Sequence, residues 1–314
     1  MHAAPIGESV VTPSCWRDTP HPQNRQGPPG SQGKWYLTPG SDISPPQAAQ
    51  LVDDLTTLVA RACAEISAVS PETVVRRVKP DQSPVTTADE ASETVILHGL
   101  ARMLPDIPIV SEESANAKKS PGLTGTFIVV DPLDGTREFL AGRDEFTVNL
   151  AIVTRGVPVA GIIAAPKRGQ LWRGVVGEKA ERLRLLPDGA DQAQTITTRR
   201  WPDAGPVAVV SRSHMDAATD AFVKALGSIT RAASGSAIKF CQIAEGNADV
   251  YPRLGTTCEW DVAAGHALVT AAGGVVTTPL GTALTYGRAA ENFRVPAFIA
   301  WGDPEKAAAV KIRN

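Results

Sequence analysis

Apolar positions first recur with a helical period shortly after residue 43. Ser44 can cap a helix whose first positions are Pro45 and Pro46, because proline suits the first turn, where its missing N–H costs nothing. The apolar residues that follow share one face of that helix, namely Ala48, Leu51, Val52, Leu55, Leu58, Val59, Ala62 and Ile66. We predict that this helix packs in the core.

Helical and strand-like patterns then alternate along the chain. The expected elements are a helix from Asp89 to Met103, strands over Ile107 to Val110 and Thr126 to Val130, and a hairpin whose strands begin at Phe146 and Val157 and meet at Arg155 and Gly156. Residues 177–201 are polar and interrupted, so we expect a seam between two lobes there.

The second half continues the alternation. Its expected elements are a strand Val207 to Ser211, helices near Asp216 to Leu226 and Ser236 to Glu245, a strand Ala248 to Tyr251, a helix opening at Trp260 or Asp261, a strand Ala297 to Trp301 and a helix from Pro304. Helices between strands predict an α/β (α+β) layered fold.

The first 40 residues differ from the rest, with seven prolines, five glycines and no apolar period. Such a composition cannot bury enough surface to offset the entropy of ordering. We therefore divide the chain into a disordered tail (1–43), an N-terminal metal-binding lobe (44–176) and a C-terminal substrate lobe (177–314).

Composition narrows the function classes. The chain has 43% hydrophobic residues, 31 Lys plus Arg against 33 Asp plus Glu, and a net charge of −2. A protein with a net charge this close to zero has no overall positive field to attract nucleic acid. No apolar run is long enough for a membrane span, and no signal peptide is evident. The four cysteines form no CxxC pair, and the five histidines have no zinc spacing. We expect a cytoplasmic protein, with peripheral association at the inner membrane left open.

The segment TFIVVDPLDGTREF carries the strongest chemical signal, because an apolar strand runs directly into Asp131 and Asp134. Pro132 fixes φ and Gly135 permits a tight turn, so the two carboxylates can converge where a hard cation would bind. The amides of Gly135 and Thr136 can point toward a phosphate. Taken alone, the segment also fits an ordinary turn in which Asp134 caps a helix.

Three further acidic motifs favour the metal interpretation over the turn. The strand before Ser111 ends in SEES, which includes Glu112 and Glu113. CEWD places Asp261 at a helix N-terminus, where an acid can also be a simple cap. The loop KPDQSPVTTAD contains Asp81 and leads into a helix for which Thr87 or Asp89 is the expected cap.

In order and approximate spacing, these four motifs resemble those of the magnesium-dependent, lithium-sensitive inositol monophosphatase superfamily. The segments SRSH and GSAIKFCQIAEGNADVYPR are similar to those of CysQ-type 3'(2'),5'-bisphosphate nucleotidases within it. The resemblance runs from about Leu51 to Ala300. It implies an αβαβα sandwich with the active site between two lobes, and hydrolysis of 3'-phosphoadenosine 5'-phosphate to AMP and phosphate in sulfur metabolism.

The resemblance also implies the residue roles at the site. Two or three Mg²⁺ ions would be held by Glu112, Asp131, Asp134, Asp261 and the Leu133 carbonyl, which suits an oxygen-only ligand set. Asp81 and Thr136 would form the catalytic pair that orients and deprotonates the attacking water. Glu113 would support a further metal or its water shell, with Lys79 in the same loop.

A bisphosphate substrate also needs cations for its second phosphate. The expected substrate-binding residues, all in loops or at helix N-termini, are Gly135, Thr136, Arg212, His214, Ser236, Lys239, Arg253 and Asp261. Taken singly, several of the basic residues in this set could equally be solvent-exposed surface residues that bind no ligand. His266 lies among small apolar residues, which favours a packing role.

Other functions remain as alternatives. An inositol monophosphatase with the same mechanism fits the acidic motifs equally well. A haloacid-dehalogenase-type phosphatase would use Asp131 as nucleophile, but its acids are separated by one residue rather than two. A non-catalytic binding module would not need the complete set of ligands, and no P-loop motif occurs. The expected partner is a small phosphorylated nucleotide, and the protein is either a monomer or a homodimer.

Overall fold

The computed structural model describes residues 42–79, 84–115, 123–213 and 215–310. Its helices are α1 (Pro45–Ala68), α2 (Thr87–Met103), α3 (Thr136–Leu140), α4 (Ala217–Ala225), α5 (Ile238–Ala244), α6 (Glu259–Ala271) and α7 (Pro304–Ala309), with 3-10 turns at Pro166–Arg168 and Ala289–Glu291. All but the last two residues of the expected tail lie outside the described ranges.

One sheet has seven strands in the order β3-β4-β5-β6-β7-β8-β9, of which only the β3–β4 pair is parallel. These strands are β3 (Ile109–Ser111), β4 (Thr126–Asp134), β5 (Thr147–Thr154), β6 (Val157–Ala165), β7 (Gln170–Val175), β8 (Ala180–Leu186) and β9 (Gly189–Ile196).

A second sheet has five strands in the order β11-β10-β12-β16-β14, with mixed directions. They are β10 (Val207–Ser211), β11 (Thr230–Ser234), β12 (Val250–Arg253), β14 (Val275–Thr277) and β16 (Phe298–Trp301). Two small ribbons complete the fold, β1 (Arg76–Val78) with β2 (Pro84–Thr86), and β13 (Thr257–Cys258) with β15 (Arg294–Val295).

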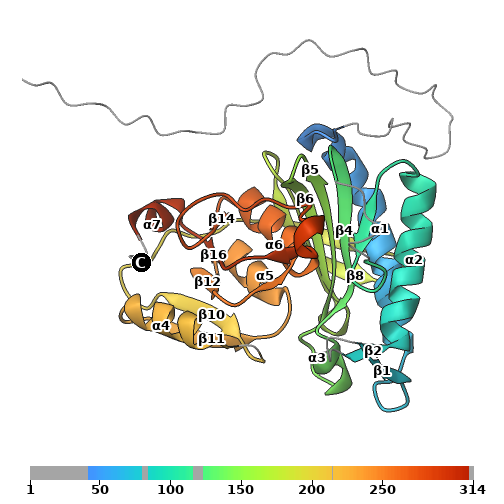
Figure 1. Cartoon of the computed structure of the whole chain (residues 1–314), viewed down its shortest axis with the longest axis horizontal. Coiled ribbons are helices and arrows are strands. Elements are labelled where there is room, and N and C mark those ends of the chain that lie inside the picture. Colours follow the sequence, from blue (N-terminus) through green and yellow to red (C-terminus); the bar gives the residue numbers. More distant parts are fainter. Residues whose placement is uncertain (1–41, 80–83, 116–122, 214, 311–314) are drawn as a thin grey trace, which may run out of the picture.

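Helices and sheets alternate in five layers (Figure 1). Helices α1 and α2 cover the outer face of the large sheet, α5 and α6 lie between the two sheets, and α4 and α7 cover the far face of the small sheet. Separate apolar clusters fill the spaces under α1 and α2, around α5 and α6, and under α4 and α7. The expected αβαβα sandwich is therefore confirmed.

Helix α6 lies unusually close to the large sheet because of a glycine. A Cβ atom on Gly161 of β6 would lie 2.2 Å from the Ala264 carbonyl oxygen, well inside contact distance. This close approach places the N-terminus of α6, which carries Asp261, beside the end of β4, which carries Asp131 and Asp134.

Most of the expected elements are confirmed, including the capped first helix, the β5–β6 hairpin and the strand Val207–Ser211. The expected seam at residues 177–201 is wrong. Residues 180–196 form β8, which pairs antiparallel with β7, and β9, which pairs antiparallel with β8, so both extend the large sheet. Because β9 is mostly polar and exposed, its sequence lacks the apolar alternation of a half-buried strand. The chain passes from the large sheet to the small one between Ile196 and Val207.

Candidate active site

The first acids of the site lie where β4 leaves the large sheet. Pairing with β5 is regular up to Asp131 and then shifts before Asp134, so the strand bulges between the two acids. Asp131 is 1% exposed, and one of its carboxylate oxygens accepts a hydrogen bond from the Leu133 amide at 3.1 Å. Gly135 then turns the chain into α3 with φ +92°, a conformation that favours glycine.

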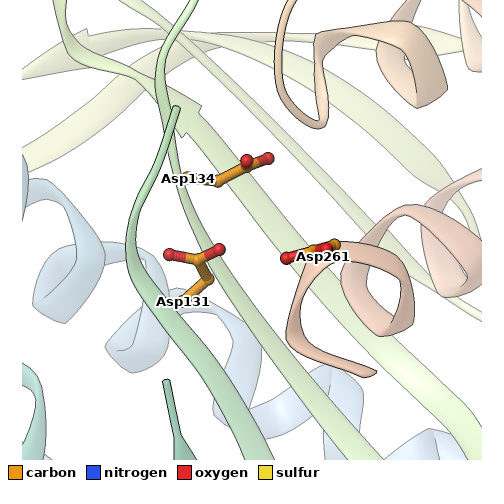
Figure 2. Close-up of side chains that lie close together, drawn as sticks. All are labelled: Asp131, Asp134 and Asp261. Carbon is orange, nitrogen blue, oxygen red and sulfur yellow. The ribbon is translucent and has the colours of Figure 1, made fainter. Parts of the chain in front are cut away.

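Asp261 reaches the same place from the first turn of α6. Its Oδ2 accepts hydrogen bonds from the Thr257 hydroxyl and from the Cys258 amide, the latter at 3.2 Å. One carboxylate oxygen from each of Asp131, Asp134 and Asp261 lies within 4.8 Å of the others, and the three side chains converge from two elements (Figure 2). We call these three residues the carboxylate cluster.

Glu112 lines the same cavity but is engaged by a cation. The Lys79 ammonium lies 2.7 Å from a carboxylate oxygen of Glu112 and 2.7 Å from one of Glu113. Although burial opposes it, these two carboxylates raise the pKa of Lys79. Of the four predicted acidic metal ligands, the described structure therefore gathers three closely and holds Glu112 beside them.

The acids of the site repel one another in a poorly solvated place. Burial raises the pKa of Asp134 to about 7, and the charge of Asp261 adds to the effect. Burial likewise raises the pKa of Glu112 to about 7 and that of Asp131 well above its ordinary value. Carboxylates that resist ionisation because they share one site are stabilised by a divalent cation, and an all-oxygen set suits Mg²⁺. The residues present therefore fit a metal site.

Thr136 pairs with Asp89, an acid that sequence reasoning treated as a helix cap. The Thr136 hydroxyl donates to Asp89 Oδ1 at 3.1 Å. The other oxygen, Oδ2, accepts from the Thr86 amide at 2.9 Å and hydroxyl at 2.6 Å, so Asp89 also closes the capping box of α2. Burial raises the pKa of Asp89, although the hydrogen bonds from Thr86 and Thr136 oppose it. Asp81, the expected partner of Thr136, lies outside the described residues.

The cluster opens into a cavity of about 290 Å³ between the two lobes. One wall comes from β4, α3 and Glu112, and the other from residues of the second lobe. Four basic side chains line it, namely Arg137, Lys239, Arg253 and Arg294. The cavity thus joins an acidic end to a wall that carries several cations.

Lys239 is the most constrained of these cations. It is 2% exposed, and its ammonium donates to the carbonyl oxygens of Ser236 at 2.5 Å and Ser234 at 3.4 Å. The ammonium also lies 5.1 Å from the centre of the Tyr251 ring. As expected from the sequence, Ser236, Lys239 and Arg253 line the cavity together with Gly135 and Thr136.

Arg212 does not line the cavity, and the structure gives it a different partner. Its guanidinium makes a two-pronged ion pair with Glu145, with Nε 2.8 Å and Nη2 2.9 Å from the two carboxylate oxygens. The expectation that Arg212 binds substrate directly is not supported by this placement. His214 lies outside the described residues. His266 is partly buried and hydrogen bonds to Tyr286 at 2.9 Å, a placement that fits the predicted packing role.

Sequence reasoning missed three residues of the site: Asp89, Arg137 and Arg294. The motif VTTAD already contained Asp89, but a helix cap explained it fully. Arg137 follows DPLDGT directly, so its position beside the acids could have been noticed. Arg294 reaches the cavity only because β15 pairs with β13, a pairing that places Arg294 opposite Cys258 and that no local pattern indicates.

Among the described helices, none is both long and apolar enough to cross a membrane.

Comparison with known proteins finds relatives along most of the chain. The family model described as "Inositol monophosphatase family" matches residues 47–308. The 3'(2'),5'-bisphosphate nucleotidase CysQ of Salmonella typhimurium is 40% identical over 228 residues, which cover 70% of this chain and 86% of the relative. The protein of the same name from Escherichia coli strain K12 is 39% identical over 221 residues, with the same coverage of 70% and 86%.

A solved structure gives the same relationship in three dimensions. The crystal structure of CysQ from Bacteroides thetaiotaomicron, described as a bacterial member of the inositol monophosphatase family, matches with a TM-score of 0.69. The two are 32% identical, and the match covers 81% of this chain and 97% of the other.

Proposed function

We propose that this chain, which belongs to the inositol monophosphatase family, is a metal-dependent 3'(2'),5'-bisphosphate nucleotidase that hydrolyses 3'-phosphoadenosine 5'-phosphate to AMP and phosphate. The observation that carries the proposal is the cavity with a carboxylate cluster at one end and basic side chains along its wall. Such a site can bind one phosphate through metal and a second through cations. The identity of 40% to a CysQ nucleotidase supports the same substrate class.

The acidic end is the proposed metal site. Asp131, Asp134, Asp261, Glu112 and the Leu133 carbonyl would hold two or three Mg²⁺ ions. When bound there, Mg²⁺ supplies positive charge that stabilises both the attacked phosphate and the departing oxygen. Lys79 offsets part of the negative charge of Glu112 and Glu113.

We assign the catalytic pair to Thr136 and Asp89. The Thr136 hydroxyl lies 3.1 Å from Asp89 Oδ1 and 3.3 Å from the Leu133 carbonyl oxygen. With its one proton donated to Asp89, its oxygen lone pairs can accept a hydrogen bond from a water molecule. That water, once aligned, attacks the phosphorus as the bond from phosphorus to the 3'-oxygen breaks. Its proton passes to the Thr136 oxygen while the Thr136 proton moves to Asp89, and the departing 3'-oxygen takes up a proton from solvent. The burial that raises the pKa of Asp89 makes its carboxylate a better proton acceptor.

The cationic wall is the proposed site for the 5'-phosphate. Lys239 and Arg253 line the cavity from the second lobe, and Gly135 and Thr136 line it from the first, where they would face the scissile phosphate. We therefore assign residues 42–196 to a metal-binding lobe and residues 207–310 to a substrate lobe, with Asp261 as the acid that the second lobe contributes. Inositol 1-phosphate has no second phosphate for these basic side chains to bind.

The test is product analysis in ¹⁸O-labelled water. Incubated with Mg²⁺ and 3'-phosphoadenosine 5'-phosphate, the protein is expected to release 5'-AMP and phosphate carrying one ¹⁸O atom, with no phosphorylated Asp131. Release of 3'-AMP would contradict the orientation of the substrate. A trapped phosphoaspartate would contradict the water nucleophile, and the absence of turnover would contradict the activity itself.

A further inference from the structure

A two-pronged ion pair joins the substrate lobe to the metal-binding lobe beside the cavity. It links Arg212, after β10, to Glu145, in the loop before β5, with N–O distances of 2.8 and 2.9 Å. The Glu145 side chain is 10% exposed and that of Arg212 is 40% exposed. The Arg212 hydrogen bonds hold the pKa of Glu145 below its ordinary range, so the pair stays ionised at neutral pH. Parallel hydrogen bonds of this kind fix orientation as well as distance.

The pair belongs to a chain of contacts that reaches the carboxylate cluster. Arg212 Nη2 also donates to the Ala233 carbonyl at 2.9 Å, which ties it to the end of β11. From the segment that follows, the Ser236 hydroxyl lies 2.7 Å from the Glu145 carbonyl oxygen and 2.9 Å from that of Asp134. Glu145 is therefore linked to Ala233 through Arg212, and to Ser236 through its own backbone carbonyl.

Close packing shows that this junction has little freedom. A Cβ atom on Gly135 would lie 2.2 Å from the Ser236 hydroxyl, and Ser236 itself has φ +47°, in the left-handed region. The carbonyl of Ser236 in turn holds the Lys239 ammonium at 2.5 Å. A displacement of residues 234–236 would therefore move the cation proposed to bind the 5'-phosphate.

Asp134 takes part in these contacts through its carbonyl, but Asp261 does not depend on them. Asp261 is carried by α6, which packs against β4, β5, β6 and β7 through buried side chains of the central apolar cluster. Loss of the ion pair would leave this packing in place. Asp261 is thus anchored by the core, whereas Lys239 is anchored by the junction.

We propose that Arg212 and Glu145 form a positioning pair that sets the distance between the Lys239 ammonium and the carboxylate cluster, and so selects substrates with a second phosphate. The inference rests on the proposed function, because it takes the wall at Lys239 as the 5'-phosphate site. Arg212 acts through Glu145 and Ser236 and does not contact the substrate.

Steady-state kinetics of Arg212→Ala, Glu145→Gln and the double variant test the pair, with 3'-phosphoadenosine 5'-phosphate and 3'-AMP as substrates. Each single variant is expected to raise KM for the bisphosphate about tenfold, the size of effect for a lost charged hydrogen bond. KM for 3'-AMP, which lacks the second phosphate, should stay within about twofold. The double variant should be no worse than either single one, because both remove the same interaction.

Arg199→Ala is the matched control. Arg199 makes the same two-pronged pair with Asp249, at 2.8 and 2.7 Å, with 41% of its side chain exposed, yet neither residue lines the cavity. It should lower the melting temperature without changing either KM. Arg212→Lys keeps the positive charge but loses the two parallel N–H donors of the guanidinium, so it should give a KM for the bisphosphate between those of the wild type and the alanine variant. This variant keeps the test usable if Arg212→Ala does not fold.

Two outcomes overturn the inference. If Arg212→Ala raises KM for the bisphosphate while Glu145→Gln leaves it unchanged, Arg212 contacts the substrate directly. If all variants show wild-type KM values, the junction does not position Lys239. Failure of the wild-type protein to hydrolyse the bisphosphate, measured in the same assay, would instead count against the proposed function.

Discussion

Replacement of Asp89 by Asn separates the two roles that the structure gives this carboxylate. One oxygen accepts hydrogen bonds from the amide and hydroxyl of Thr86, and the other accepts from the Thr136 hydroxyl. An Asn side chain has one acceptor and one donor group. Because the helix cap needs the acceptor, the amide NH₂ would face Thr136 and could not take its proton.

The expected loss follows from these two roles. Loss of a positioned general base lowers kcat by about 10²- to 10⁴-fold. Weakening the cap of α2 costs about 1 kcal/mol of stability, since the Asn oxygen still accepts from the Thr86 amide. Product affinity should change little, because Asp89 faces Thr136 and not the cationic wall.

Phosphate release under saturating substrate, with AMP affinity by calorimetry and thermal unfolding alongside, measures all three effects. Asp216→Asn is the control, because Asp216 also caps a helix, α4, outside the cavity: its Oδ1 accepts from the Thr219 amide (2.8 Å) and its Oδ2 from the Thr219 hydroxyl (2.6 Å). It should reproduce the loss of stability without the loss of kcat. An Asp89→Asn enzyme with kcat within about threefold of wild type would refute the assignment of this residue as the base.

Three further predictions concern charge and packing at the site. The folded-state pKa values of Glu112 and Asp134 are about 7, above their ordinary values of 4.5 and 3.8, so the folded state binds more protons than the unfolded state between these limits. With EDTA present, the unfolding free energy should therefore fall as pH rises from about 4 to 7, and added Mg²⁺ should reduce that fall. Denaturant titrations across this pH range, with EDTA or with Mg²⁺, measure both effects. An unfolding free energy that rises with pH in EDTA would contradict the prediction. Gly161→Ala should cost about 1–3 kcal/mol of stability and raise the Mg²⁺ requirement, because it pushes α6 away from β6; unchanged melting and metal dependence would show that the contact is tolerated. Lys239→Met should raise KM for the bisphosphate about tenfold but spare 3'-AMP in the same assay, and an equal effect on both substrates would remove Lys239 from the 5'-phosphate site.

The sequence predicts the buried elements well because burial imposes a period. The apolar run from Thr126 predicts β4, and the proline-led periodic stretch predicts α1 with its capping Ser44. Strands β8 and β9 escape prediction because much of β9 faces solvent and needs no apolar alternation. Polar sequence at the edge of a sheet and polar sequence in a linker look alike, which is why the lobe boundary was expected too early.

Prediction of the site succeeds where a motif carries the chemistry and fails where distant pairing decides it. The DPLDGT and EWD motifs correctly indicate a carboxylate cluster of Asp131, Asp134 and Asp261. The partner of Arg212 lies 67 residues away in the chain, and no local pattern shows that Glu145 engages it. Asp89 serves as a cap and a hydrogen-bond acceptor at once, and the first role conceals the second in the sequence.

We propose that the cavity selects a nucleotide with two phosphates. The decisive measurement compares kcat/KM, from phosphate release at equal Mg²⁺, for 3'-phosphoadenosine 5'-phosphate and for inositol 1-phosphate. The charges on the cavity wall predict a preference of at least about tenfold for the bisphosphate, the gain expected from one additional charged contact. Equal values, or faster hydrolysis of inositol 1-phosphate, would contradict the account.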